Sequence, residues 1–226
     1  MTASTSRLEL PDRATRHAIA RRFPSISQRC YVRAKLGSDP VYAATAGVCA
    51  TAPRLPLLDV GCGMGLLGHF LHACQMLDEY HGLDHDARKI TAGHVAAASL
   101  DGALDLQHGD VTDLPDCHGH VALLDVLHYL PARRQTDLLT RLTGHVAPGG
   151  RLIIRNVLRE PHWRFRATVI EEHVLSASGW MRVGATHYPC AEEIRAPLEA
   201  AGLKVTIAPL WGRTPFNSYL VVAHRH

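Results

Sequence analysis

The sequence predicts an α/β protein organised around a doubly wound, mostly parallel sheet. A short apolar strand over residues 57–60 runs directly into a glycine-rich turn and an amphipathic helix. A second apolar run, over residues 121–127, is nearly continuous, as a central parallel strand covered on both faces requires. Strand and helix patterns also alternate along the chain, which favours parallel βαβ units. In such sheets ligands bind beyond the carboxyl ends of the strands.

The composition limits the class of protein. With 226 residues and 46% hydrophobic content, the chain suits one full domain with room for a small appendage. No apolar run approaches the ~18 residues of a membrane span. The first six residues lack the apolar core of a signal peptide, so we expect a cytoplasmic protein. A net charge of +3 is too small to imply a nucleic-acid partner.

No metal site is predicted. The six cysteines form no C-x-x-C pair, which favours reduced thiols over a zinc cage. His118 and His120 are close in sequence, but no third ligand lies at helical or hairpin spacing from them.

The N-terminal region is expected to be helical and basic. We expect helices over residues 13–36, broken near Pro24, and over residues 40–50. Residues 1–36 contain eight Arg or Lys against two acids, so this region is either a solvated face or a cap that helps bind an anionic substrate or a carrier. In a cap, Tyr31 and Tyr42 are the aromatic residues we expect to face the pocket and bind substrate.

The glycine turn is the strongest signal in the chain. Gly61, Gly63 and Gly65 permit positive φ angles and close approach of the backbone to a ligand. Exposed amides at the following helix N-terminus favour an electron-rich ligand. Residues 63–68 fit G-x-G-x-x-G, the dinucleotide fingerprint, which alone is a weak signal. Asp59, two residues before the first glycine, has no part in that fingerprint.

The run Leu-Asp-Val-Gly-Cys-Gly-Met-Gly at residues 58–65 resembles the first motif of class I S-adenosylmethionine (SAM)-dependent methyltransferases. The resemblance implies a Rossmann-like sheet of seven strands that ends in an antiparallel C-terminal hairpin, here residues 203–210 and 217–224. It implies SAM as the cofactor, bound by Asp59, Gly61, Cys62 and Gly63. The small Cys62 side chain fits the turn and receives no chemical role.

A carboxylate ends the second expected strand. Asp84 closes residues 81–84, about 20 residues beyond the glycines, where an acid accepts hydrogen bonds from ribose hydroxyls. Its carboxylate can accept both hydroxyl protons. His85 follows directly and is assigned to the same site. Both dinucleotide enzymes and methyltransferases use such an acid, so Asp84 indicates a ribose without choosing between them.

The third strand, residues 104–108, leads to Asp110 and Val111. By the resemblance, the Asp110 carboxylate accepts from the adenine amino group and the Val111 amide donates to a ring nitrogen. The alternative for Asp110 is an ordinary Asx turn. A dinucleotide dehydrogenase would not need this third acid.

The fourth strand carries the catalytic candidates. Its run Asp-Val-Leu-His-Tyr-Leu-Pro at residues 125–131 resembles the fourth methyltransferase motif, although members often have an acid where this chain has His120. Asp125 is expected to be the fourth acid around the cofactor. His128 is the first candidate for a general base and Tyr129 the second, because both follow the strand into the cleft. The alternative for His128 is a packed histidine in a helical turn.

The fifth strand, residues 151–156, follows a Pro-Gly-Gly turn that also resembles the family. Arg155 is expected to leave it towards the cleft, where it either binds a substrate carboxylate in bidentate fashion or forms a salt bridge with a neighbouring acid. Residues 159–182 are expected to form a helix over the pocket, and Cys190 to cap the last helix rather than act as a nucleophile.

Together these features predict a helical lid over residues 1–50 and a SAM-binding domain over residues 51–226. The expected activity is methyl transfer to a small molecule; the alternatives are an RNA or protein methyltransferase and a non-catalytic module that binds SAM or S-adenosylhomocysteine (SAH). Residues 29–42 resemble methyltransferases of bacterial aryl-polyene pigment clusters, which implies a phenolic acceptor, free or on a carrier. The sequence leaves the methylated atom and the oligomeric state open.

Overall fold

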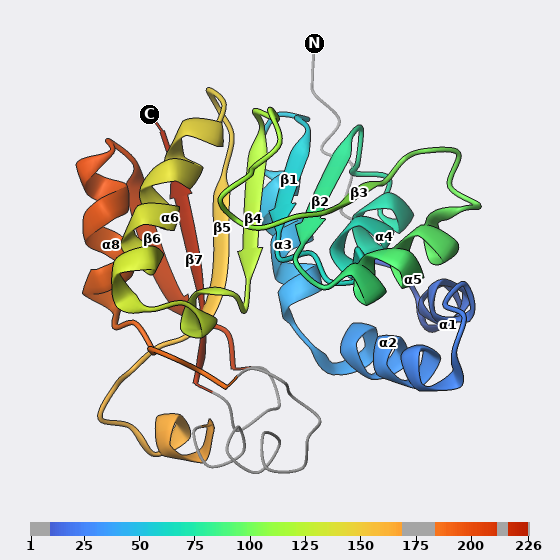
Figure 1. Cartoon of the computed structure of the whole chain (residues 1–226), viewed down its shortest axis with the longest axis horizontal. Coiled ribbons are helices and arrows are strands. Elements are labelled where there is room, and N and C mark those ends of the chain that lie inside the picture. The colour runs from blue at the N-terminus through green and yellow to red at the C-terminus, as the bar shows by residue number, and fades with distance from the viewer. Residues whose placement is uncertain (1–9, 169–183, 212–216, 226) are drawn as a thin grey trace.

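A seven-stranded sheet forms the centre of the molecule in the computed structural model, which describes residues 10–168, 184–211 and 217–225 (Figure 1). The strand order is β3-β2-β1-β4-β5-β7-β6. Strands β1 to β5 are parallel, and β7 pairs antiparallel with both β5 and β6. The predicted doubly wound sheet with an antiparallel C-terminal hairpin is therefore confirmed. The strands are β1 (Leu57–Val60), β2 (Tyr80–Asp84), β3 (Asp105–His108), β4 (His120–Leu124), β5 (Leu152–Val157), β6 (Lys204–Pro209) and β7 (Ser218–His224).

Helices cover both faces of the sheet and divide its core in two. Because side chains alternate along a strand, Leu57 of β1 belongs to one buried cluster while Leu58 and Val60 belong to the other. The first cluster lies under α1 (Arg13–Arg21), α2 (Ile26–Ser38), α3 (Val41–Ala50), α4 (Leu66–Ala73) and α5 (Ala87–Ala97). The second lies under α6 (Ala132–His145) and α8 (Ala191–Ala200).

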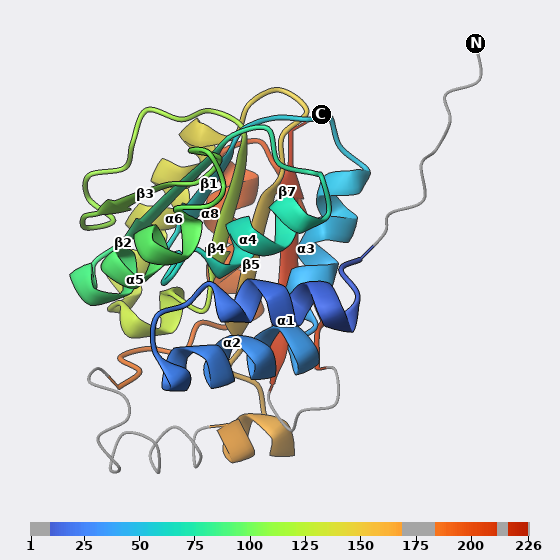
Figure 2. The same ribbon diagram turned by 90° about the vertical axis from the view of Figure 1, so that its right-hand side faces the viewer.

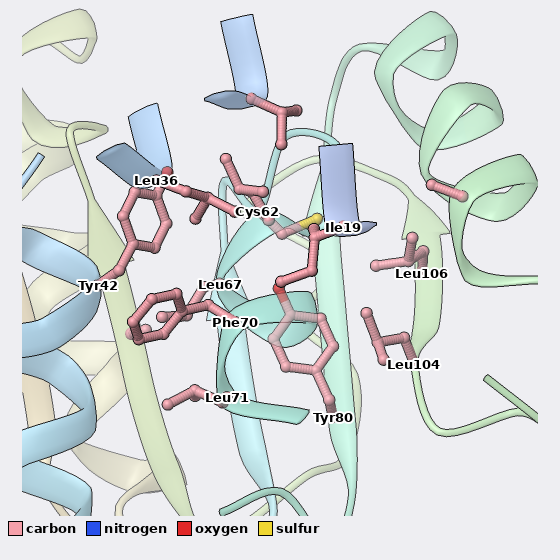
Figure 3. Close-up of a cluster of buried hydrophobic side chains, with 14 of the residues drawn as sticks. Ile19, Leu36, Tyr42, Cys62, Leu67, Phe70, Leu71, Tyr80, Leu104 and Leu106 are labelled. Atoms are coloured by element: carbon pink, nitrogen blue, oxygen red, sulfur yellow. The ribbon is translucent and has the colours of Figure 1, made fainter. Parts of the chain in front are cut away.

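The N-terminal helices are part of this core. The predicted break near Pro24 is confirmed: α1 ends at Arg21, and Ser25 caps α2 through a capping box with Gln28. Figure 3 shows Leu36 and Tyr42 beside α4, and the rings of Tyr42 and Phe70 lie 5.7 Å apart. Helices α1 to α3 thus share apolar burial with β1 and α4.

One predicted element agrees with the structure and another is described only in part. Strand β4 ends at Leu124, because Asp125 adopts a left-handed conformation with φ of +59° that turns the chain. A short 3₁₀ helix, η1 (Leu127–Tyr129), follows this turn. Of the helix expected over residues 159–182, residues 163–168 are helical and residues 169–182 lie outside the described part.

The carboxyl ends of the parallel strands lie at the lower edge of the sheet in Figure 1. Helix α2 and the helical residues 163–168 both lie at this edge, as the turned view in Figure 2 also shows. In the described ranges, no helix has the length and apolarity needed to cross a bilayer.

Candidate active site

The glycine turn lies between β1 and α4 and is tied to β2. The amides of Gly61 and Cys62 both donate to the carbonyl of Leu83, at 2.7 and 3.0 Å. A Cβ added at Gly61 would lie 2.3 Å from Val126 Cγ2, so packing excludes a side chain there. A Cβ at Gly63, whose φ is +61°, would meet no atom within 4 Å. Gly63 therefore faces open space where a ligand can approach the backbone.

Asp84 is held against this turn by backbone amides. One oxygen of its buried carboxylate accepts from Gly63 N and the other from Asp86 N, both at 2.8 Å. Each oxygen retains a second lone pair for a further donor such as a ribose hydroxyl. The neighbouring His85 side chain is 75% exposed, with Nδ1 3.7 Å from Asp84 Oδ1. The structure thus brings the glycine turn and Asp84, each predicted for the cofactor site, into direct contact.

Asp110 lies in an exposed loop after β3. Its Oδ1 accepts from Thr112 N at 3.0 Å, forming the Asx turn considered above, and this backbone hydrogen bond lowers the pKa of Asp110. Arg141 donates to the carbonyls of Val111 and Thr112, at 3.1 and 2.6 Å, and so fixes the loop. The Asx turn and a role towards adenine are compatible, since a carboxylate has two acceptor oxygens.

Asp59 lies beneath the turn, in the core. Its Oδ2 accepts a 2.5 Å hydrogen bond from the buried Tyr80 hydroxyl. Burial raises the pKa of Asp59 to about 7, with Tyr80 opposing the rise and Asp84 adding to it. In this arrangement Asp59 fixes Tyr80 and β2. The four predicted acids each bond to a different protein group, and among the described residues no two of them share a partner. They are Asp59, Asp84, Asp110 and Asp125.

An ionic cluster occupies the end of β4 and β5; it consists of Lys35, Asp39, Asp125 and Arg155. Arg155 Nη1 pairs with Asp125 Oδ2 and, at 3.2 Å, with Asp39 Oδ2. Lys35 Nζ lies 3.0 Å from the same Asp39 oxygen. The salt-bridge alternative for Arg155 is therefore the one seen, and Asp39 and Lys35 are the residues that sequence reasoning missed.

The predicted substrate residues gather around this cluster. Burial alone would raise the pKa of Asp39, but Arg155 and Lys35 outweigh it and lower that pKa. The phenol of Tyr42 is buried, and its pKa rises well above the usual value through burial, then Tyr31 and the cluster's carboxylates. Tyr31 is 44% exposed beside it. Tyr31, Tyr42 and Arg155 thus form one region with Asp125.

His128 is buried in η1 and is oriented by β5. Its Nδ1 lies 3.0 Å from Asn156 Oδ1, while Asn156 Nδ2 donates to the Val157 carbonyl at 2.8 Å. Because the second bond fixes the amide, Oδ1 must accept, and the His128 proton resides on Nδ1. The Nε2 lone pair then remains for another proton, and no described side chain bonds to it. No local sequence pattern predicts this pair, because His128 and Asn156 lie 28 residues apart and meet only in the folded sheet.

Aromatic rings surround His128. Tyr129 lies 4.1 Å away between ring centroids, and Tyr188 stacks at 6.0 Å with an interplanar angle of 9°. Phe165, in the helical residues 163–168, packs edge-on against Tyr188. Backbone amides of Thr186 and His187 donate to the His128 carbonyl and hold η1 in place. Tyr129, Tyr188 and Phe165 therefore form an aromatic wall next to the His128 imidazole.

Residues 57–150 match a family described as a methyltransferase domain, and this range contains the glycine turn, Asp84, Asp110 and η1. This part of the chain is therefore similar to a methyltransferase domain, as the first motif implied. The open space at Gly63, together with the remaining lone pairs of Asp84, fits the nucleoside of SAM, the cofactor that the sequence resemblance implies. No curated protein matches the chain significantly.

Solved structures share the methyltransferase fold at low identity. Magnesium protoporphyrin IX methyltransferase from Synechocystis PCC 6803, with bound SAH, is 20% identical with a TM-score of 0.64, over 90% of this chain and 88% of that one. An O-methyltransferase family protein from Burkholderia thailandensis is 20% identical with a TM-score of 0.66, over 88% of this chain and 60% of that one. Mitomycin 7-O-methyltransferase is 20% identical with a TM-score of 0.60, over 89% of this chain and 59% of that one.

Proposed function

We propose that this methyltransferase methylates a small-molecule acceptor, phenolic and either free or carrier-bound, with His128 as the general base. The observation that carries the proposal is the His128–Asn156 pair, which leaves Nε2 able to accept a proton at the carboxyl edge of the sheet. The aromatic wall of Tyr129, Tyr188 and Phe165 suits a flat acceptor. The names of two structural neighbours, a porphyrin and a mitomycin methyltransferase, support a small-molecule acceptor.

In this proposal the chain holds the cofactor with backbone and carboxylates. The glycine turn at residues 61–63 would lie against it, Asp84 would accept from the ribose, and Asp110 with Val111 would contact adenine. Asp59 supports the turn from below through Tyr80. Asp125, with 32% of its side chain exposed, would face the ammonium group of the cofactor. When bound, SAM supplies a methyl group on a positive sulfur that is ready for in-line displacement.

The chain's own contribution is to orient the acceptor and remove its proton. His128 Nε2 would take the hydroxyl proton of the acceptor, whose oxygen would receive the methyl group that bound SAM supplies, with SAH left behind. Orientation lowers the barrier by roughly 7–11 kcal/mol, and a base contributes on the order of 10²–10⁴-fold. Tyr129 is the second candidate for the base.

The test begins with isotope-labelled methyl transfer from SAM into cell extract, with the product identified by mass spectrometry. For that product, His128→Ala should lower kcat by about 10²–10⁴-fold with SAH affinity nearly unchanged. Tyr129→Phe removes the competing phenol and should leave most of the turnover. Wild-type turnover in His128→Ala would exclude this residue as the base.

An RNA or protein acceptor is the second candidate, favoured by the basic N-terminal helices. Arg13, Arg21 and Arg33 are exposed, and no described acid forms an ion pair with them. Label that disappears from extract after nuclease or protease treatment would support this candidate. Cofactor binding in calorimetry without any label transfer would instead indicate a non-catalytic module. We also propose a cytoplasmic location, consistent with six free cysteines.

A further inference from the structure

Asp39 joins the N-terminal helices to the sheet. It lies between α2 and α3, and its Oδ1 accepts from Val41 N at 3.1 Å, at the start of α3. Its Oδ2 accepts from Arg155 Nη1 at 3.2 Å and from Lys35 Nζ at 3.0 Å. One carboxylate therefore organises the α2–α3 junction and also binds a side chain of β5, 116 residues later.

The junction is buried where it meets the sheet. The side chains of Asp39 and Arg155 are 8% and 10% exposed, whereas Asp125 is 32% exposed. Arg155 Nη2 lies 3.4 Å from Ser218 Oγ, and its Nε is buried without a hydrogen-bond partner. The Arg155 guanidinium is thus held mainly by two carboxylates. These are Asp39, between α2 and α3, and Asp125, which follows β4. Removing either carboxylate leaves buried charge uncompensated.

We propose that Asp39 is a positioning residue that latches α2 and α3 over the acceptor site through Arg155, which Asp39 shares with Asp125. The proposal deepens the proposed function, because it takes Asp125 as a contact of the cofactor. No other carboxylate in the described residues bonds to Arg155. The competition between the two carboxylates is therefore direct.

This sharing couples the lid to the cofactor. An ammonium group that engages the exposed side of Asp125 weakens the hold of Asp125 on Arg155. Arg155 then pairs more fully with Asp39 and draws α2 and α3 onto the sheet. Coupling is reciprocal, so a lid that cannot pair with Arg155 must also bind such a ligand more weakly.

Hydrogen exchange measured by mass spectrometry, with and without SAH, tests the latch. SAH carries the ammonium group and does not react. In the wild type, SAH should slow exchange over residues 26–50. In Asp39→Asn this region should exchange faster without ligand, the SAH effect should be lost, and SAH affinity should fall about fivefold or more. Asp39→Glu, which retains the charge, should restore part of both effects.

Glu199→Gln is the matched control, because it removes an acid from an exposed ion pair with Arg195 on α8, remote from the lid. It should change neither lid exchange nor SAH affinity. Equal exchange over residues 26–50 in Asp39→Asn and wild type would overturn the latch. If Asp39→Asn does not fold, Asp39→Ser serves, since a serine hydroxyl can still accept from Val41 N.

The outcomes separate the latch from the proposed function. Failure of wild-type protein to bind SAH would contradict the cofactor site, while the ligand-free comparison of wild type and Asp39→Asn would still test the latch. Normal SAH binding with an unchanged lid would overturn the latch alone.

Discussion

The two sides of the proposed active site are constructed differently. On the cofactor side, Asp84 is held by amides of Gly63 and Asp86, so nearby backbone creates the geometry. On the acceptor side, the ionic cluster joins side chains of α2, β4 and β5 and the α2–α3 junction. A local motif can therefore specify the first side, whereas the second depends on the complete fold. The consequences of mutation should differ in the same way.

The largest expected effect is on the ionic cluster. Arg155→Met leaves the buried Asp39 and the partly exposed Asp125 with only Lys35 for compensation, so the free energy of unfolding should fall by about 3–5 kcal/mol. Removing the exposed Arg195–Glu199 pair by Glu199→Gln should cost about 0–1 kcal/mol. Urea denaturation of the two variants measures both values. Similar losses in the two variants would mean that the cluster is not the structural joint described above.

The next largest effect is a pH dependence of the free energy of unfolding, caused by Asp59 beneath the glycine turn. The pKa of Asp59 rises on folding from 3.8 to about 7, so the folded state binds the proton more tightly than the unfolded state. Its stabilising contribution is complete below about pH 4 and is lost as pH rises towards 7, at up to about 1.4 kcal/mol per pH unit. Asp59→Asn removes this titration.

Stability curves of wild type and Asp59→Asn between pH 4 and 8 measure this contribution. The difference in the free energy of unfolding between the two proteins should change between about pH 4 and pH 7 and be constant above about pH 7. Parallel curves throughout would show that Asp59 does not titrate in the folded protein.

A smaller effect is expected at Asp110. Asparagine can still accept from Thr112 N, so Asp110→Asn should change the free energy of unfolding by less than about 0.5 kcal/mol. It loses the carboxylate expected to accept from adenine, so SAH affinity should fall about tenfold, or about 1.4 kcal/mol. Calorimetry and denaturation on one preparation measure both quantities. Unchanged affinity would leave Asp110 with the Asx turn alone.

The sequence predicted the sheet well, and it placed Gly63 and Asp84 at neighbouring strand ends, because these signals are local. Alternating and continuous apolar runs indicate strands, and Gly63 with Asp84 follows from spacing along two βα units. The partner of Asp59 was not predicted, because Tyr80 meets it only after β1 and β2 pair. The end of β4 at Asp125 was predicted, but the left-handed backbone of Asp125 was not, since a positive φ leaves no mark in the apolar run around it.

The acceptor side was predicted only in part. Tyr31, Tyr42 and Arg155 were named separately, and the structure brings them together around charges that no spacing rule connects. Asp39 precedes Pro40 and looks, from sequence, like an ordinary residue between two helices. Its role as the partner of Arg155 depends on how the N-terminal helices pack against the sheet.

The most direct measurement of the central claim compares SAH binding in Gly63→Ala and Gly202→Ala. Both glycines have positive φ, +61° and +81°, and an added Cβ meets no atom within 4 Å at either, so backbone strain is matched. Only Gly63 is expected to lie against the cofactor. Calorimetry should show SAH affinity at least about tenfold weaker in Gly63→Ala and unchanged in Gly202→Ala. Equal affinity in the two variants would contradict a cofactor site at the glycine turn.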